Sequence, residues 1–320
     1  MAFGYKDTDA TWDDVFTTTF RKVHREFVDN IFTARPLAYF LAQAGQVVQI
    51  DGGVQIQESI VGATNSNTDT YSGSDPLNTA ETEEVTSAIY PWRQLASAVT
   101  VTGLEEAQNA GEAAIMDLLN VKIEVARESI VEKMNNMFHG DGTGNGGKDF
   151  NGLGNLIGTQ NNTVGGINAT NNTWWNPTHV HVGSGQANLA LADMYNAFNS
   201  ASVGADTPGF VLMEQDNFEV YEGLLDDNRR YVDSAVADAG FQALQFKGKP
   251  VLFDSDPNFT ANMVYFINPK YLRLKVHSDR FFKAGPFIQP TNQDLRTMKM
   301  LTYGNLVVNN RSRHAMLETL

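Results

Sequence analysis

The sequence contains no cysteine, and this absence removes several kinds of chemistry together. A chain of 320 residues without a thiol has no disulfide, no thiolate nucleophile and no cysteine-ligated metal. It also lacks any run of eighteen apolar residues, and its first residues, MAFGYKDTDATWDD, are polar and acidic. The sequence therefore predicts neither a membrane span nor a secretory signal, and we expect a protein that is made and folded in a cytoplasm.

Basic residues are scarce in this chain. Lys and Arg together number 23 against 37 Asp and Glu, so the formal net charge is −14. Domains that hold nucleic acid by neutralising phosphates are usually basic, and this balance argues against such a role. With 42% hydrophobic and 19% charged residues the composition is that of a globular protein, and the length is typical of two domains.

Motifs for catalysis and for metal binding are also lacking, with no HExxH and no GxSxG. Gly142 to Lys148 fits GxxxxGK, but a helix is predicted before it and Asp149 follows where magnesium binding needs Ser or Thr. Asp141 begins a weak calcium-loop pattern, in which Gly152 stands at the position of the bidentate Glu. We therefore predict no catalytic residue, no cofactor and no metal.

One histidine pair is the nearest approach to a metal site. His179 and His181 would project from the same side of a strand, where two imidazoles are able to share an ion. No carboxylate lies within several residues of them in the sequence. We therefore interpret the pair as a half-exposed strand face rather than as metal ligands.

The longest helical pattern covers residues 104–138. Apolar residues recur at steps of three and four in two neighbouring stripes. The first stripe contains Leu119, Ile123, Ala126, Ile130, Met134 and Met137, and the second contains Ile115, Leu118, Val121 and Val125. The pattern predicts one helix about 50 Å long, covered on most of its circumference, that serves as a strut. A long core helix of an α+β enzyme is the alternative.

Residues 46–103 are predicted to form two long extended arms joined at a polar tip, 62–78. A hairpin with so little apolar surface is unstable alone, so we expect it to rest on a neighbouring subunit. An ordinary surface hairpin packed on its own subunit is the alternative. Residues 12–44 are predicted to form an N-terminal arm with helical patches, interrupted at Arg35-Pro36, whose apolar side chains also need a surface to lie on.

The rest of the chain alternates between helices and strands without a regular βαβ repeat. The patterns predict a helix at 187–203, a strand at 208–213, a helix at 214–225, and strands from about 247 to the end. We therefore predict an α+β fold.

Opposite charges gather in two parts of the sequence. Between Asp51 and Glu84 there are seven acids and no base. Between Lys270 and Arg313 there are nine bases and two acids, a local balance of 9 − 2 = +7. The chain therefore carries an acidic pole and a basic pole.

Two motifs, in this order and spacing, carry a resemblance to a known family. The first is the GDG…FNGL loop that follows the long helix, and the second is G-x-P-V-x-x-D…Y-x-x-N-P-x-Y-L-x-L from Gly248 to Leu274. Over nearly the whole length, the chain resembles the major capsid proteins of tailed bacteriophages, which have the Hong Kong 97-type fold. The resemblance implies a structural, non-enzymatic protein that self-assembles as hexamers and pentamers into an icosahedral shell around double-stranded phage DNA.

The resemblance also implies a division of the chain. By this comparison the segments are the N-terminal arm 1–45, the extended loop or E-loop 46–103, the peripheral domain 104–185 with its spine helix 104–138, the axial domain 186–277, and C-terminal strands 278–320 that return to the peripheral domain. In the family, the E-loop of one subunit lies over the peripheral domain of the next. Head-to-tail contacts of this kind close into rings.

The sequence departs from some members of the family in two respects. No lysine occurs between Lys22 and Lys122, so the lysine isopeptide bond that welds some shells is unavailable to this hairpin. No long scaffolding segment precedes the arm, so we expect a separate scaffolding protein or prior removal of such a segment. The resemblance also implies a portal protein, optional decoration proteins, and DNA that is packaged without sequence-specific contact. It implies a virion capsid that assembles in the host cytoplasm and has no membrane partner.

We hypothesise that the acidic hairpin of one subunit docks on the basic C-terminal section of its neighbour, and that this contact weakens as salt rises. The acids assigned to it are Asp69, Asp75, Glu81, Glu83 and Glu84. The bases assigned to it are Arg273, Lys275, Arg280, Lys283, Arg296 and Lys299. Two alternatives stay open at the sequence level: an encapsulin-like bacterial compartment shell, and a cytosolic hydrolase with a glycine-rich loop.

Overall fold

The structure is a computed structural model. It describes residues 35–319 apart from 63–64, 66, 81–83, 109–111, 183–188, 226–243, 255 and 257–258. Most of the predicted arm therefore lies outside the described residues, and its last part forms helix α2 (Pro36–Gln43). Pro36 begins this helix, at a position where an amide hydrogen would have no partner within the helix.

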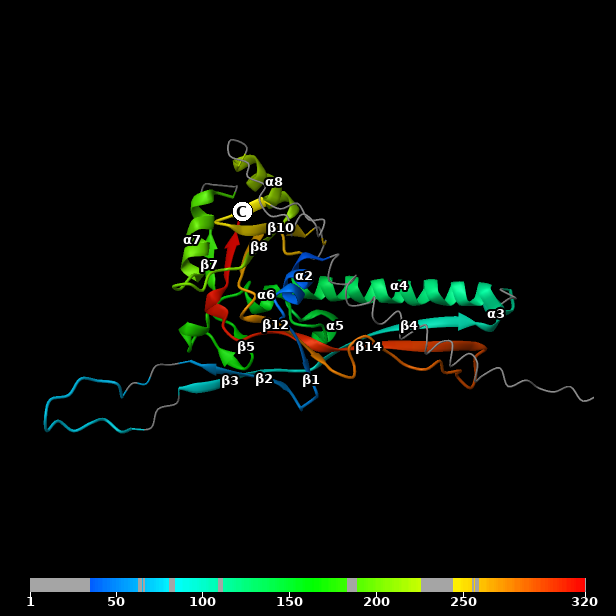
Figure 1. Cartoon of the computed structure of the whole chain (residues 1–320), viewed down its shortest axis with the longest axis horizontal. Coiled ribbons are helices and arrows are strands. Elements are labelled where there is room, and N and C mark those ends of the chain that lie inside the picture. The colour runs from blue at the N-terminus through cyan, green and yellow to red at the C-terminus, as the bar shows by residue number, and fades with distance from the viewer. Residues whose placement is uncertain are drawn as a thin grey trace, which may run out of the picture.

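Two sheets contain most of the strands in the described part of the chain (Figure 1). The first sheet has five strands: β1 (Val47–Ile50), β12 (Leu272–His277), β14 (Leu295–Val308), β13 (Lys283–Ala284) and β4 (Arg93–Thr102). The second has six strands, in the order β7 (Thr178–His181), β15 (Ala315–Glu318), β11 (Met263–Ile267), β8 (Phe210–Glu214), β10 (Lys249–Asp254) and β9 (Leu244–Phe246). Mixed sheets with interspersed helices confirm the α+β prediction.

The predicted spine forms helices α3 (Gly103–Gln108) and α4 (Glu112–His139), and residues 109–111 between them are not described. Helix α3 begins with a capping box, in which the amide of Thr102 donates to the Glu105 carboxylate and the amide of Glu105 donates to the Thr102 hydroxyl. Figure 1 shows α4 lying alongside the long strands β4 and β14. The two helices cover the segment predicted as one helix, apart from the three residues that are not described, and the role of a strut stays a prediction.

Where side chains are described, from residue 119 onward, only one of the two predicted stripes of α4 is buried. The buried stripe contains Ile123, Ala126, Ile130, Met134 and Met137, which join the larger apolar core. Val121 and Val125 of the second stripe are 58% and 57% exposed. The prediction of a helix covered on most of its circumference is wrong for a single subunit, because the sheet reaches only one side of the helix.

The glycine-rich loop after α4 folds back against the end of that helix. A Cβ atom on Gly152 would lie within 3.0 Å of the carbonyl oxygens of Met137, Phe138 and Gly140. The amide of the adjacent Asn151 donates to the Asn305 side chain of β14 at 2.8 Å. The FNGL motif thus joins the end of α4 to the first sheet. Short elements follow it: α5 (Gly144–Gly147), α6 (Leu153–Leu156), β5 (Thr163–Val164), β6 (Ile167–Asn168) and η1 (Thr173–Trp175).

The second sheet carries helices α7 (Leu191–Ala201) and α8 (Gln215–Leu224), close to the predicted bounds, and encloses a second apolar core. The chain passes from this sheet to the first at Asn268-Pro269, between β11 and β12. It returns through η2 (Arg311–Arg313), between β14 and β15. The strands therefore depart from the expected division, because β12 lies in the first sheet and the last strand, β15, lies in the second.

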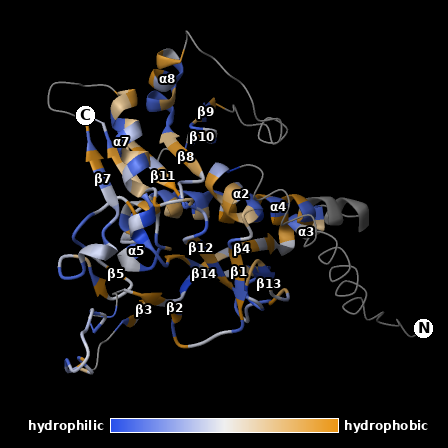
Figure 2. Ribbon diagram, turned by 60° about the vertical axis from the view of Figure 1, so that its left-hand side comes forward, coloured by the Kyte–Doolittle hydropathy of each residue, from blue (hydrophilic) through white to orange (hydrophobic). Residues whose placement is uncertain are grey.

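The predicted hairpin is shorter than expected at its base. Strands β1 and β4 belong to the first sheet, and the hairpin proper is β2 (Ile56–Val61) paired with β3 (Val85–Tyr90). From there the chain projects away from both sheets (Figure 1). Figure 2 shows hydrophobic residues on both β2 and β3. Among the described residues, none of the helices has the length and apolarity needed to cross a membrane.

The contact at Gly152 predicts a large asymmetry between two Gly→Ala substitutions. Gly152→Ala forces a methyl group against three carbonyl oxygens, and we expect it to destabilise the chain by about 3 kcal/mol or more. Gly223→Ala, on the open face of α8, meets nothing within 4 Å and should stabilise by about 0.5–1 kcal/mol. Urea unfolding of the unassembled chain measures both. Equal effects of the two substitutions would show that the loop does not pack as described.

Candidate functional site

The base of the hairpin packs on its own subunit through one face. Ile56, Glu58 and Ile60 alternate with exposed residues along β2 and are all buried. On β3, Tyr90 is also buried, and its hydroxyl donates to the carbonyl of Val308 on β14 at 2.8 Å. Desolvation raises the pKa of this tyrosine above its ordinary value. The prediction that the hairpin depends wholly on a neighbour is therefore wrong for its base.

An acid of the hairpin meets two of the predicted contact bases within the same chain. The Glu58 carboxylate lies 2.8 Å from Lys275 Nζ and 3.6 Å from Arg273 Nη1. The side chains of Glu58 and Lys275 are only 7% and 12% exposed. Arg273 and Lys275 of β12 therefore pair with a buried carboxylate of their own subunit. This counts against their assignment to the contact with a neighbouring subunit.

The other predicted acids lie toward the tip of the hairpin. Asp69 and Asp75 are exposed, and each accepts a backbone amide nearby, from Thr70 and Ser72 respectively. Glu84 precedes β3 and is half-buried. The remaining two, Glu81 and Glu83, lie outside the described residues.

Three of the other predicted bases share one face of the first sheet. Lys299 and Lys283 stand on the same side of β14 and β13, two residues apart in register, and both are exposed. Arg280 lies over the ring of Tyr303. Tyr303 and Lys299 are four residues apart on β14 and therefore project from the same face of the sheet. Arg296 is also exposed, but it projects from the other face of β14. Met298 and Met300 project from that same face and are buried in the core that includes residues of α4.

The outer face of β4 and β14 combines these bases with small side chains. Ala98 stands opposite Lys299, Ala96 opposite Leu301, and Thr100 opposite Thr297 in the antiparallel pair. Ala96, Ala98 and Thr100 are exposed. We call this outer face, together with Arg280 and Lys283, the basic platform. Small side chains allow another backbone to approach it closely.

Exposed apolar residues occur on the projecting parts of the subunit. Val61 and Val85 face each other across the hairpin on its outer side and are 74% and 69% exposed. Farther out, Tyr71 and Leu77 are also exposed. The sequence analysis described the tip as polar and did not single out these residues, although the alternation of β2 places Val61 on the face opposite to Ile56 and Ile60.

A buried ionic network attaches the end of α4 to the segment after β10. His139 Nε2 lies 3.0 Å from the Asp254 carboxylate, and the Asn135 amide donates to Asp256 at 2.6 Å. Burial alone would raise the pKa of Asp254. The hydrogen bond and the charge of His139, together with hydrogen bonds from the Asp256 amide and Asn135, hold this pKa below its usual range. The aspartate of the G-x-P-V-x-x-D motif is thus a structural anchor.

Two further buried polar residues, Arg311 and His314, lie where the chain crosses between the sheets. Arg311 is fully buried and donates to the carbonyls of Leu156 and Thr159 and to the side chain of Asn162. His314 Nδ1 accepts the amide of Asn268. Burial, and then the charge of Arg311, lower the pKa of His314 to about 3, so this histidine is neutral in the folded chain.

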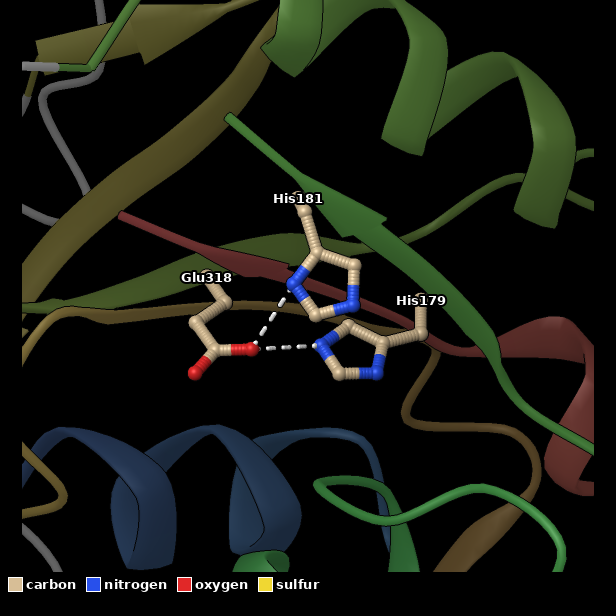
Figure 3. A group of neighbouring side chains, drawn as sticks. All are labelled: His179, His181 and Glu318. Carbon is tan, nitrogen blue, oxygen red and sulfur yellow. Dashed lines mark hydrogen bonds and ion pairs between the residues drawn. The ribbon is translucent and has the colours of Figure 1, made fainter. Parts of the chain in front are cut away.

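The histidine pair of the sequence analysis acquires a carboxylate in the fold. His181 of β7 stands opposite Glu318 of β15 in a parallel pair, and His179 lies one step along the same face. His179 Nε2 and His181 Nδ1 lie 3.2 Å and 2.9 Å from the same Glu318 oxygen (Figure 3). The sequence interpretation missed this carboxylate because it lies more than a hundred residues away in the chain.

A comparison with protein families finds a match over nearly the whole chain. The model described as "SU10 major capsid protein" matches residues 14–320. Among the curated proteins, none matches the sequence.

Solved structures similar to this one include phage capsids and an encapsulin complex. The cyanophage A-1(L) capsid asymmetric unit is 16% identical, with a TM-score of 0.65 over 86% of this chain and 90% of that chain. The capsid of Myoviridae phage XM1 is 14% identical, with a TM-score of 0.55 over 87% and 91%. The SrpI encapsulin complex from Synechococcus elongatus is 10% identical, with a TM-score of 0.50 over 73% and 75%. These likenesses establish a Hong Kong 97-like fold.

The buried Glu58 contact predicts a strong stability defect that a second substitution relieves. Glu58→Gln leaves Lys275 without its counter-charge, and we expect a loss of about 3 kcal/mol in the free energy of unfolding. The double variant Glu58→Gln/Lys275→Met should recover much of that loss, because no buried charge then lacks a partner. Asp69→Asn at the exposed tip is the control and should stay within about 0.5 kcal/mol of the parent. A control as damaging as Glu58→Gln would refute the buried contact.

The neutral His314 predicts an acid-sensitive fold. Its folded pKa is below its unfolded value, so between about pH 6.5 and 3 only the unfolded chain takes up the proton, and stability falls as the pH falls. The slope from one such group reaches about 1.4 kcal/mol per pH unit. Urea midpoints measured from pH 7 to 5 should fall less steeply for His314→Gln than for the parent. His277→Gln, at the partly exposed end of β12, is the control, and identical slopes for parent and His314→Gln would contradict the assignment.

Proposed function

Because the chain belongs to the SU10 major capsid protein family, we propose that its copies assemble as hexamers and pentamers into an icosahedral shell around the double-stranded DNA of a bacteriophage. As a major capsid protein it is a structural component of the virion rather than an enzyme, which excludes the hydrolase alternative. The observation that carries the finer proposal is the projecting hairpin, which leaves the body of its own subunit and exposes both apolar and acidic residues.

The hairpin of one subunit lies across the basic platform of the next. Its own base is already packed on β14 and β12, so the part beyond Val61 and Val85 is the part available to a neighbour. A contact between one surface and a different surface of the next copy is head-to-tail, and such contacts close into rings when the rotation allows. This arrangement produces the hexamer and the pentamer.

Charge complementarity gives this contact its direction. The tip carries Asp69 and Asp75, whereas the platform carries Arg280, Lys283 and Lys299, and all five are exposed. Exposed charges steer association and fix register more than they add affinity, and salt screens them. The exposed apolar side chains of the hairpin then supply the affinity, because burying them removes apolar surface from water.

The two sheets correspond to the two domains that the family resemblance implies. The first sheet with α4 is the peripheral domain, and the second sheet with α7 and α8 is the axial domain around the capsomer axis. With this assignment the boundary falls at the crossovers near Asn268 and Arg311 rather than at residue 277. The described end of the arm, helix α2, packs into the core of its own subunit through Leu37, Ala38 and Leu41.

A bacterial compartment shell is the second candidate, because the encapsulin complex shares the fold. The family match favours the phage shell. Purified particles distinguish the two: a phage shell contains DNA, and a compartment shell contains a protein cargo.

A phage shell further requires a scaffolding protein and a portal protein, accepts decoration proteins on its surface, and assembles in the host cytoplasm. A net charge of −14 suits a container that packs DNA without gripping it.

Charge reversal across the contact tests the hairpin arrangement. We expect Lys283→Glu/Lys299→Glu to slow shell assembly at least tenfold at low salt, because the platform then repels the hairpin tip. Asp69→Lys/Asp75→Lys should have the same effect, and the four substitutions together should restore assembly. Light scattering gives the rate, and electron microscopy shows whether shells form. In the parent, raising the salt from about 0.05 M to 1 M should also slow assembly.

The control is Glu219→Lys, an equal change of sign on the exposed face of α8. It should leave the assembly rate unchanged. Failure of the fourfold variant to recover, or an assembly rate that is indifferent to salt, would refute the charge contact. Normal hexamers and an unchanged assembly rate in each of the two reversals taken singly would refute the hairpin docking itself.

A further inference from the structure

We propose that His179, His181 and Glu318 bind a divalent transition-metal ion of the zinc class, which fastens the edge strand β7 to the C-terminal strand β15. Three potential ligand atoms from these residues lie within 4.8 Å of one another. Figure 3 shows the two imidazoles and the carboxylate pointing toward a common point from neighbouring strands. This site is independent of the contact between hairpin and platform.

The backbone produces this convergence. His179 and His181 are two residues apart on β7, so both project from one side of the sheet, whereas Val180 and Val182 pack in the apolar core beneath α7. Parallel pairing in register places Glu318 directly beside His181. The three side chains therefore meet on the sheet face opposite to α7 without any strained arrangement.

The distances suit a small ion after a slight adjustment. Zinc holds nitrogen and oxygen ligands at about 2.0–2.2 Å in a tetrahedron, which places neighbouring ligand atoms about 3.4 Å apart. The two imidazole nitrogens lie 3.2 Å and 2.9 Å from the carboxylate oxygen, so those spacings already match. The remaining spacing, between the two imidazole nitrogens, is at most 4.8 Å, and the side chain of His181 is 67% exposed.

The chemistry of the three groups selects the class of ion. Two imidazole nitrogens and one carboxylate oxygen are the ligands that zinc, copper and nickel accept, whereas calcium and magnesium prefer oxygen alone. The two rings are tilted to each other with their centroids 4.1 Å apart, and one nitrogen of each lies near the same Glu318 oxygen.

The position of the site gives the ion a structural role. β7 is an edge strand of the second sheet and pairs only with β15 among the described strands. An ion held by both strands adds a link between residues that are distant in the sequence, and it stabilises the folded chain because the unfolded chain lacks the preformed site. Three protein ligands leave a fourth position for water.

Zinc titration of the full-length chain, freed of metal by chelation, tests the site. We expect one zinc ion per chain by calorimetry, a rise of a few degrees in melting temperature with zinc, and visible absorption typical of tetrahedral cobalt when cobalt replaces it. His181→Asn and Glu318→Gln should each lower the affinity at least about tenfold and abolish the thermal shift. Both side chains are partly exposed, so both variants should fold.

His277→Asn removes an imidazole outside the site and should bind zinc as the parent does. Magnesium should produce neither heat nor thermal shift. The proposal is wrong if the parent shows no saturable zinc binding, or if His181→Asn and Glu318→Gln bind zinc as tightly as the parent and the His277→Asn control.

Discussion

The packing of one side of α4 against β4 and β14 is the interaction on which the rest of the subunit depends. Burial of five apolar residues of the helix joins it to the core of the first sheet, and the FNGL loop holds its end against β14. Once this layer is formed, the hairpin has a fixed base and a fixed direction. The same layer leaves the opposite side of α4, with Val121 and Val125, uncovered in the single subunit.

The two crossovers between the sheets lie against each other, and buried polar groups hold them together. The amide of Asn268 in the first crossover donates to His314, and the amide of Asn309 before the second donates to the carbonyl of Tyr271. Arg311 is charged and buried in this region, and it donates to the carbonyl oxygens of Leu156 and Thr159 and to the side chain of Asn162. Charges buried in this way add little net stability but are costly to leave without partners. The contact therefore specifies how the two halves of the subunit are joined.

Local patterns predicted the elements of this fold well. The three-four spacing located α4, the strand pattern predicted from about residue 247 onward includes β12, and the GDG…FNGL loop marked the end of the helix. The fold class and the family followed from the order of these elements. Each rests on neighbours in the sequence, or on propensities that a short segment expresses by itself.

Pairing between distant residues was beyond such patterns. Composition indicated an acidic pole and a basic pole, but their contact between subunits stays a prediction, and one such pair, Glu58 with Lys275, forms inside one subunit instead. The same limit hid Glu318 from the two histidines. By itself the sequence determined the helices, the strands and the family, because periodicity and motif order are local properties. Only the tertiary structure decided which charges are buried within their own subunit and which side chains contact each other, because strand register brings together residues far apart in the chain.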